Sequence, residues 1–123
     1  MQKKILVIED DIDLAKILKA ALEKNGYLAC VALDGAEALD AIMKENIDLI
    51  VTDLKMNWVE GDVVAQLVRR YEKTSHIPIL VYTGLSPQEI AQYQLEGVKA
   101  IIPKPTEPKV LLQKIKEVLL EPA

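Results

Sequence analysis

Carboxylates follow two apolar, strand-like runs of this sequence. Glu9 and Asp10 come directly after the run at 5–8, and Asp53 follows the run at 48–52. If these runs are neighbouring parallel strands, their acids share one pocket at the edge of a sheet. Like charges this close are costly unless a cation joins them, and Mg²⁺ is the usual oxygen-seeking cation in proteins. The pattern therefore predicts a magnesium site, with Glu9, Asp10 and Asp53 binding the ion directly or through water.

A hydroxyl and an ammonium are expected at the same edge. Thr83 follows the apolar run at 77–82, and Lys104 lies between two prolines just after the run at 99–102. A carboxylate beside a divalent cation and an ammonium can attack a phosphoryl group in line. A threonine hydroxyl can donate a hydrogen bond to a phosphoryl oxygen. We therefore predict phosphoryl chemistry, with Asp53 as the nucleophile and Thr83 and Lys104 as its phosphate partners.

Several of these residues also have simpler explanations. Acids in the first turn of a helix interact favourably with its dipole, and we assign that role to Asp11 and Asp13. The dipole does not explain a second acid at the end of a neighbouring strand, so Asp10 is kept as a metal ligand. Thr83 could instead cap a turn, and Lys104 could be a surface lysine, although a lysine between two prolines at a strand end is an unusual surface choice.

Helix-period segments alternate with apolar runs along the whole chain. We expect strands at 5–8, 27–32, 48–52, 77–82 and 99–102. The five expected helices should bury these residues, helix by helix: Leu14, Ile17, Leu18, Ala21 and Leu22; Leu39, Ile42 and Met43; Val64, Leu67, Val68 and Tyr71; Ile90, Ala91 and Leu95; and Leu111, Ile115, Val118 and Leu119.

Capping residues mark several helix ends. Gly26 suits the left-handed cap of the first helix, and Asp34 with Glu37 has capping-box spacing for the second. The Ser-Pro-Gln-Glu segment at 86–89 supplies an N-cap and an N1 proline for a fourth helix, which we expect to end at Gly97. The apolar face of that helix is thin, so it should be the least firmly packed of the five.

Five strand–helix units with strands apolar on both faces predict an α/β fold. The expected architecture is a doubly wound, five-stranded parallel sheet with helices on both faces. Right-handed crossovers permit few topologies, and the flavodoxin-like order 2-1-3-4-5 places strands one and three side by side. Ligands of such sheets bind beyond the carboxyl ends of the strands, where both acid clusters fall.

Composition narrows the class of protein. A chain of 123 residues fits a single domain, at 1–123. It has no apolar stretch near the ~20 residues of a membrane span and begins directly with a strand, so we expect a soluble cytoplasmic protein without a membrane partner. The lone Cys30 rules out an internal disulfide, and a net charge of −4 argues against direct nucleic-acid binding.

The residues that carry the predicted chemistry also point to a family. The set Glu9-Asp10, Asp53, Thr83 and Lys104-Pro105, on five strand–helix units covering the chain, resembles the receiver domain of two-component response regulators. The resemblance implies that Asp53 accepts a phosphoryl group from the phosphohistidine of a sensor histidine kinase or phosphotransfer protein, or from a small phosphodonor. In this phosphorelay role the protein is a phosphoacceptor rather than an enzyme.

The resemblance also implies roles for individual residues. Mg²⁺ would be bound by Asp10, Asp53 and the backbone carbonyl of Lys55, with Glu9 assisting through water. Thr83 and Lys104 would contact the phosphoryl group, and the peptide bond after Lys104 would be cis. Phosphorylation would alter the face formed by the fourth helix, fifth strand and fifth helix, for a downstream protein or output domain or for a possible dimer.

The sequence departs from the family pattern at several positions. Ile101 stands three residues before the lysine, where receivers usually carry an aromatic switch residue, and Asn57 replaces a common proline and is a candidate cap for the third helix. Lys55 and Leu85 occupy positions that tune water access, and we predict slow loss of the phosphoryl group. Trp58 is expected in a loop near the pocket.

Two other classes of protein are considered. An aspartate-nucleophile phosphatase of the haloacid dehalogenase kind would need a second aspartate two residues after the nucleophile, where Lys55 stands, and a cap domain. An interaction module that keeps the fold without being phosphorylated is disfavoured by the acids, threonine and lysine, although Ile101 leaves it open. Tyr93 is a candidate for an interaction surface, and His76 is expected at the surface.

Overall fold

The chain folds around one parallel β-sheet. The computed structural model describes residues 2–56 and 59–121. Its strands are β1 (Lys4–Ile8), β2 (Leu28–Ala32), β3 (Leu49–Thr52), β4 (Ile79–Thr83) and β5 (Ala100–Pro103). All neighbours pair in parallel, in the order β2-β1-β3-β4-β5, so the predicted flavodoxin-like topology is confirmed.

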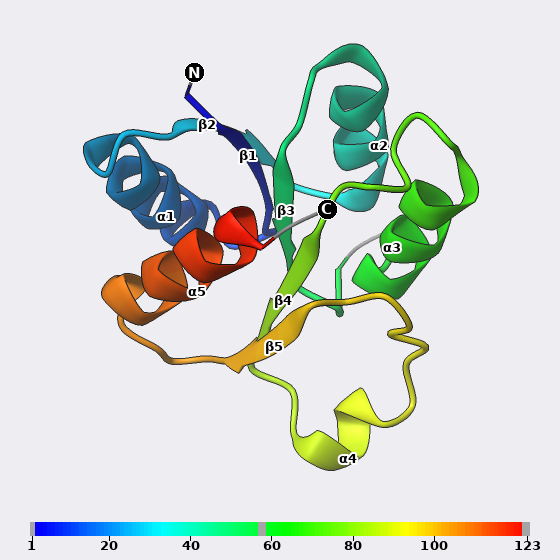
Figure 1. Cartoon of the computed structure of the whole chain (residues 1–123). Coiled ribbons are helices and arrows are strands. Elements are labelled where there is room, and N and C mark those ends of the chain that lie inside the picture. Colours follow the sequence, from blue (N-terminus) through cyan, green and yellow to red (C-terminus); the bar gives the residue numbers. More distant parts are fainter. Residues whose placement is uncertain (1, 57–58, 122–123) are drawn as a thin grey trace.

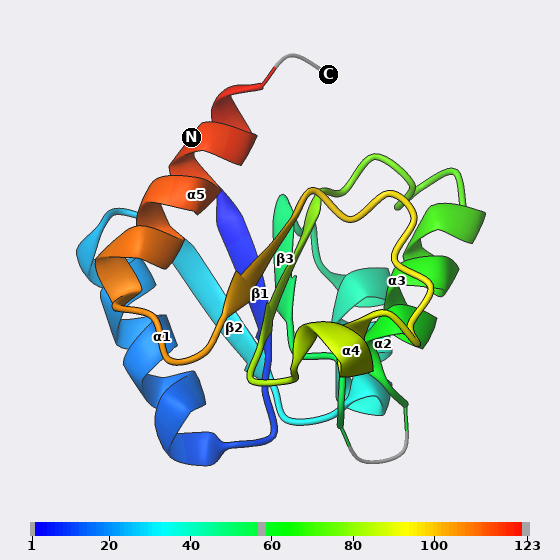
Figure 2. The same cartoon turned by 90° about the horizontal axis from the view of Figure 1, so that it is seen from below.

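Helices cover both faces of the sheet. Helices α1 (Ile12–Lys24) and α5 (Pro108–Leu120) lie on one face, and α2 (Gly35–Lys44) and α3 (Gly61–Arg70) lie on the other (Figures 1 and 2). The short α4 (Pro87–Ile90) lies beyond the carboxyl end of β4. None of the helices in the described ranges is long and apolar enough to cross a membrane.

The central strands are buried because a helical layer covers each of their faces. β3 and β4 have no exposed residue, and alternate residues of β1 belong to two separate apolar clusters, one on each side of the sheet. Pro103 ends the edge strand β5, where its missing N–H breaks no further ladder bond. The continuous apolar runs of the sequence therefore reflect burial on two sides.

The helices bury narrower stripes than the sequence predicts. Among the residues expected on buried faces, Ala91 is exposed, and three large side chains are more than half exposed: Ile17, Met43 and Tyr71. The first three helices bury large residues as predicted, among them Leu18, Ile42 and Val64. They also bury three small ones: Ala15, Ala38 and Ala65. The buried stripe of these helices therefore includes alanines, and the larger Ile17, Met43 and Tyr71 lie at the boundary with solvent.

The capping residues are as predicted at one helix start and one helix end, and differ from the prediction at another start. Asp34 accepts a hydrogen bond from the amide of Glu37, and Gly26 has a positive φ of 90° after α1, both as predicted. The N-cap of α3 is Glu60, without a side-chain cap, so the helix starts later than a cap at Asn57 would require. Asn57 itself lies outside the described residues.

The fourth helix is much shorter than predicted. Ser86 and Glu89 form the expected capping box, but α4 ends at Ile90 rather than near Gly97. The helix buries none of its residues, so little packing energy opposes the entropy of extending it. The chain beyond it is tied down at Gly97, which has a φ of 82° and whose carbonyl accepts a 2.8 Å hydrogen bond from the Arg69 guanidinium.

Candidate functional site

The register of β1 and β3 brings two acids to one edge of the sheet. Ile8 pairs with Thr52, the last residues of these strands. The next residues along the two strands are Glu9 and Asp53, and the Asp53 amide donates a 3.2 Å hydrogen bond to the carbonyl of Ile8. Parallel pairing therefore holds the two carboxylates on adjacent strands, as predicted.

The register of β4 and β5 does the same for the hydroxyl and the ammonium. Thr83 pairs with Pro103 at the ends of these strands. The Lys104 amide then donates a 2.9 Å hydrogen bond to the Thr83 carbonyl. The peptide bond between Lys104 and Pro105 is cis, as the resemblance implies.

Lys104 bridges the two acids. Its Nζ lies 2.6 Å from Oε1 of Glu9 and 2.8 Å from Oδ2 of Asp53. The side chains of Glu9, Asp53 and Lys104 are 3%, 13% and 20% exposed. The cluster is thus mostly shielded from water, with its ammonium end the more accessible part.

Backbone amides hold the remaining carboxylate oxygens. Oδ1 of Asp53 accepts a 2.7 Å hydrogen bond from the amide of Leu54, and Oε2 of Glu9 accepts one of 3.2 Å from the amide of Asp11. Each carboxylate is therefore fixed at both oxygens. Asp11 also caps α1 with its side chain, in keeping with its predicted role at that helix start.

Burial and hydrogen bonding shift the pKa values of Glu9 and Lys104 in the cluster. Burial raises the pKa of Glu9 above its usual value, and the nearby Lys104 only partly offsets this. Burial alone would lower the pKa of Lys104, but its hydrogen bonds to Asp53 and Glu9 outweigh burial and raise it. One ammonium facing two carboxylates thus remains charged well above neutral pH, and the cluster has room for more positive charge.

Thr83 is buried beside Lys104 and keeps a hydrogen to donate. Its side chain is in a residue only 1% exposed, and its Oγ1 accepts a 3.3 Å hydrogen bond from the amide of Leu85. Because that bond uses a lone pair, the hydroxyl hydrogen is available to an incoming oxygen.

The donor chemistry at this edge suits a hard cation. Asp10 and Lys55 are exposed, and Asp10 follows directly on Glu9. The three carboxylates of Glu9, Asp10 and Asp53 outnumber the ammonium of Lys104, which leaves two negative charges that a divalent cation would neutralise. No three acid, histidine or cysteine side chains of the described residues converge closely enough to hold a metal alone. A bound Mg²⁺ would therefore also need oxygens from backbone, water or phosphate.

Two residues of this site escaped prediction from the sequence. The ring of Tyr82 lies under the Lys104 ammonium, with Nζ 5.4 Å from the ring centroid. Gly61 packs so closely on the loop after β3 that an added Cβ would lie 2.0 Å from the carbonyl oxygen of Asp53. A tyrosine directly before Thr83 and a glycine eight residues after Asp53 were the available signals.

Other residues considered from the sequence lie away from the cluster or outside the description. Trp58 is outside the described residues. His76 is exposed, as predicted. Tyr93 is half-buried just after α4, and burial together with the nearby Glu60 raises its pKa. Cys30 is a free thiol whose pKa burial raises.

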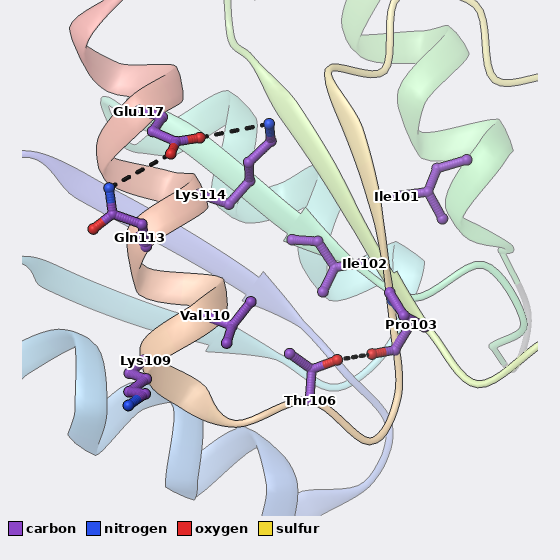
Figure 3. Close-up of a pocket in the computed structure, with 9 residues that line it drawn as sticks. All are labelled: Ile101, Ile102, Pro103, Thr106, Lys109, Val110, Gln113, Lys114 and Glu117. Carbon is purple, nitrogen blue, oxygen red and sulfur yellow. Dashed lines mark hydrogen bonds and ion pairs between the residues drawn. The ribbon is translucent and has the colours of Figure 1, made fainter.

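A groove runs between β5 and α5, next to the cluster. Its cavity volume is about 730 Å³. Ile102 and Val110 point toward one another across it, whereas Ile101 points to the other side of β5 and is 42% exposed (Figure 3). Thr106 also lines the groove, and its hydroxyl donates to the carbonyl of Pro103 (Figure 3).

The sequence matches a known protein family. The family model for the response regulator receiver domain matches residues 5–116. The chain belongs to this family. The match contains every strand of the sheet except the first residue of β1, and all of the site residues described above.

The chain matches part of longer curated relatives. The chain is 36% identical over 93% of its length to the CAI-1 autoinducer sensor kinase/phosphatase CqsS of Vibrio cholerae. It is 40% identical over 97% of its length to the probable transcriptional regulator ycf27 of Porphyridium aerugineum. It spans only 17% and 49% of these relatives' own lengths.

Solved receiver structures share the fold. A CheY-like receiver domain protein from Methanospirillum hungatei superimposes with a TM-score of 0.89 at 31% identity, covering 97% of this chain and 94% of that one. The receiver domain of a Pseudomonas aeruginosa sensor histidine kinase gives a TM-score of 0.90 at 20% identity, covering 98% of this chain and 100% of that one. That domain was solved with a magnesium ion coordinated in its active-site cleft.

Proposed function

We propose that this receiver, as one domain over residues 1–123, is a phosphorylation-dependent signalling switch of a two-component phosphorelay. Asp53 accepts the phosphoryl group, and Thr83 and Lys104 bind it. The observation that carries the proposal is the Lys104 ammonium, which contacts both Glu9 and Asp53 from a different strand end. An ammonium placed there can neutralise charge on a phosphoryl group as it is transferred.

Asp53 is positioned to act as a nucleophile. Its side chain is held by the Leu54 amide and Lys104, and it keeps 13% of its surface accessible. A carboxylate oxygen attacks phosphorus while the bond from phosphorus to the donor breaks. With a phosphohistidine donor, the P–N electron pair goes to the imidazole nitrogen and the product is an aspartyl phosphate. Thr83 donates a hydrogen bond to one phosphoryl oxygen, and Lys104 pairs with another.

Asp10, Asp53 and the Lys55 backbone carbonyl would hold Mg²⁺, with Glu9 assisting through water. The ion would supply positive charge that stabilises the transferring phosphoryl oxygens. This assignment is supported by the excess of carboxylates in the cluster and by their oxygen-only donor chemistry.

The proposed partners lie on either side of this transfer. A sensor histidine kinase or phosphotransfer protein supplies the phosphoryl group, and a downstream protein or output domain responds to it. The groove between β5 and α5 and the exposed Ile101 offer apolar surface beside the site for that response, or for a phosphorylation-dependent dimer. Acting once per phosphoryl group, the domain is a phosphoacceptor rather than a turnover enzyme.

Phosphorylation by acetyl phosphate tests the proposal. The purified protein is incubated with acetyl phosphate and Mg²⁺, and intact-mass spectrometry with peptide mapping locates the adduct. We expect one base-labile phosphoryl group on Asp53, formed only when Mg²⁺ is present. Asp53→Asn should abolish it.

Asp40→Asn is the matched control. Asp40 is an exposed aspartate whose ion pair with Lys44 lies on α2, away from the cluster. It should be labelled like the wild type. The proposal would be contradicted if the wild type acquired no phosphoryl group, or if the Asp53→Asn variant were still labelled. Steady release of phosphate from phosphomonoesters would point to the phosphatase alternative.

A further inference from the structure

Tyr82 connects the cluster to the loop after β5. Its side chain points into the layer between the sheet and α5, in a residue only 5% exposed. The Lys104 Nζ lies over its ring, 5.4 Å from the centroid, and its hydroxyl donates a 3.2 Å hydrogen bond to the carbonyl of Thr106. One buried side chain thus contacts both the ammonium of the site and a residue that lines the β5–α5 groove.

We propose that Tyr82 is a positioning residue, which holds the Lys104 ammonium by its ring and the β5–α5 loop by its hydroxyl. The ring face attracts the ammonium electrostatically, and this attraction is stronger where water is partly excluded, as it is around a side chain only 20% exposed. The face of the ring therefore attracts the ammonium, while the carboxylates of Glu9 and Asp53 accept hydrogen bonds from its N–H groups.

The hydroxyl has a separate consequence. Thr106 is held twice, by Tyr82 at its carbonyl and through its own hydroxyl at the carbonyl of Pro103 (Figure 3). A shift of Lys104 toward a phosphoryl group changes the contact over the ring, and the same side chain anchors the loop that leads into α5. Tyr82 gives this chain a route from site to groove that does not use Ile101.

Ring and hydroxyl can be separated by two substitutions. Tyr82→Phe keeps the ring and removes the hydroxyl, whereas Tyr82→Leu removes both. Leu80→Val is the matched control, because Leu80 lies in the same strand and the same apolar cluster, is fully buried, and is two residues away from the tyrosine.

The first measurement is NMR of the unphosphorylated protein and needs no phosphoryl chemistry. The ring current of Tyr82 should shift the ε-methylene protons of Lys104 upfield. We expect the shift in the wild type, Tyr82→Phe and Leu80→Val, and its loss in Tyr82→Leu. The backbone resonances of Thr106 should move in both Tyr82 variants. Lysine protons at ordinary positions in the wild type would overturn the proposal.

The second measurement is the rate of labelling by acetyl phosphate at fixed Mg²⁺, and it rests on the proposed function. Tyr82→Leu should label about five-fold more slowly, with Tyr82→Phe restoring the rate to within about two-fold. Leu80→Val should label at the wild-type rate. Equal rates for wild type and Tyr82→Leu, or an equal loss in Leu80→Val, would overturn the positioning role.

The two measurements separate failure of this inference from failure of the proposed function. If the wild type is not phosphorylated, the proposed function fails, while the lysine ring-current shift and its loss in Tyr82→Leu still decide whether Tyr82 positions Lys104. If the wild type is phosphorylated and Tyr82→Leu is labelled at the same rate, only the positioning role is wrong.

Discussion

Replacing Lys104 with methionine removes the ammonium that bridges Glu9 and Asp53 and leaves most of the side-chain volume in place. In the wild type the ammonium lies 2.6 and 2.8 Å from the two carboxylates. In Lys104→Met these acids would remain close together with only backbone amides as partners. We expect a clear loss of folding stability at neutral pH.

The size of the loss follows from burial and distance. At an effective dielectric constant of about 20, each ion pair contributes roughly 6 kcal/mol of attraction. Desolvation of the three ions cancels much of this, and breaking a buried pair by removing one partner costs about 3 to 5 kcal/mol. Because the lysine side chain is 20% exposed and screened there, we expect the lower end, about 3 kcal/mol. For a domain of this size, that loss lowers Tm by about 10 °C.

Urea unfolding at pH 7 measures the loss, without Mg²⁺ and then with it. A divalent cation supplies the missing positive charge, so saturating Mg²⁺ should stabilise Lys104→Met more than it stabilises the wild type. Lowering the pH should also narrow the gap between them, because protonated carboxylates no longer need the ammonium. Lys44→Met is the control: its pair with Asp40 is exposed and should matter by less than about 1 kcal/mol.

Two results would refute this reasoning. The first is a Lys104→Met protein as stable as the Lys44→Met control, because the ammonium would then contribute nothing to the cluster. The second is a destabilised Lys104→Met protein whose deficit does not change with pH, because lost packing rather than unpaired charge would then be the cause.

Three further predictions concern residues around the cluster. Glu9→Gln should raise the free energy of unfolding at pH 7, because the raised pKa of Glu9 means that its charged form disfavours the fold. The contribution of Glu9 to wild-type stability should fall as pH rises from 4.5 through that pKa, and the difference in unfolding free energy between variant and wild type, measured across this pH range, checks it. Gly61→Ala should cost about 1 to 3 kcal/mol, since its Cβ would meet the Asp53 carbonyl, whereas Gly84→Ala has ordinary contacts and should be tolerated in the same melts. The phosphoryl group on Asp53 should persist for minutes, and timed mass spectrometry measures its loss. Loss within seconds would show that Leu85 does not restrict the access of water to it.

The topology could be predicted because the strands carry a simple signal. Runs such as 5–8 and 48–52 are apolar at every position, which indicates burial on two faces and hence a parallel sheet. The helix faces were harder, because periodicity does not distinguish a buried Ala15 from a nearby large residue such as Ile17. The end of α4 was missed because Gly97 resembles a helix cap, although here it is a hydrogen-bond partner of Arg69.

In the site, too, the residues at strand ends could be predicted from the sequence, whereas a tertiary contact could not. Glu9, Asp53, Thr83 and Lys104 could be placed together from the sequence because each lies at or just after the end of a strand, and parallel pairing brings such residues to one edge. The contact between Lys104 and Tyr82 could not be predicted, because a tyrosine in an apolar run is expected to be an ordinary core residue. Only the packing under α5 places its ring beneath the ammonium and its hydroxyl on the next loop.

The charges of the cluster favour the ligand-bound state of the domain over the free state. One ammonium is shared by two largely buried carboxylates, and the pKa of Glu9 is raised because burial makes its charge costly. A cation relieves it, and a phosphoryl group on Asp53 would give Lys104 a new partner in place of the Asp53 carboxylate. Because the same lysine lies on the ring of Tyr82, any change of partner must alter a contact buried against α5. The local charge imbalance therefore gives a physical reason why binding at the sheet edge would change the structure beside the β5–α5 groove.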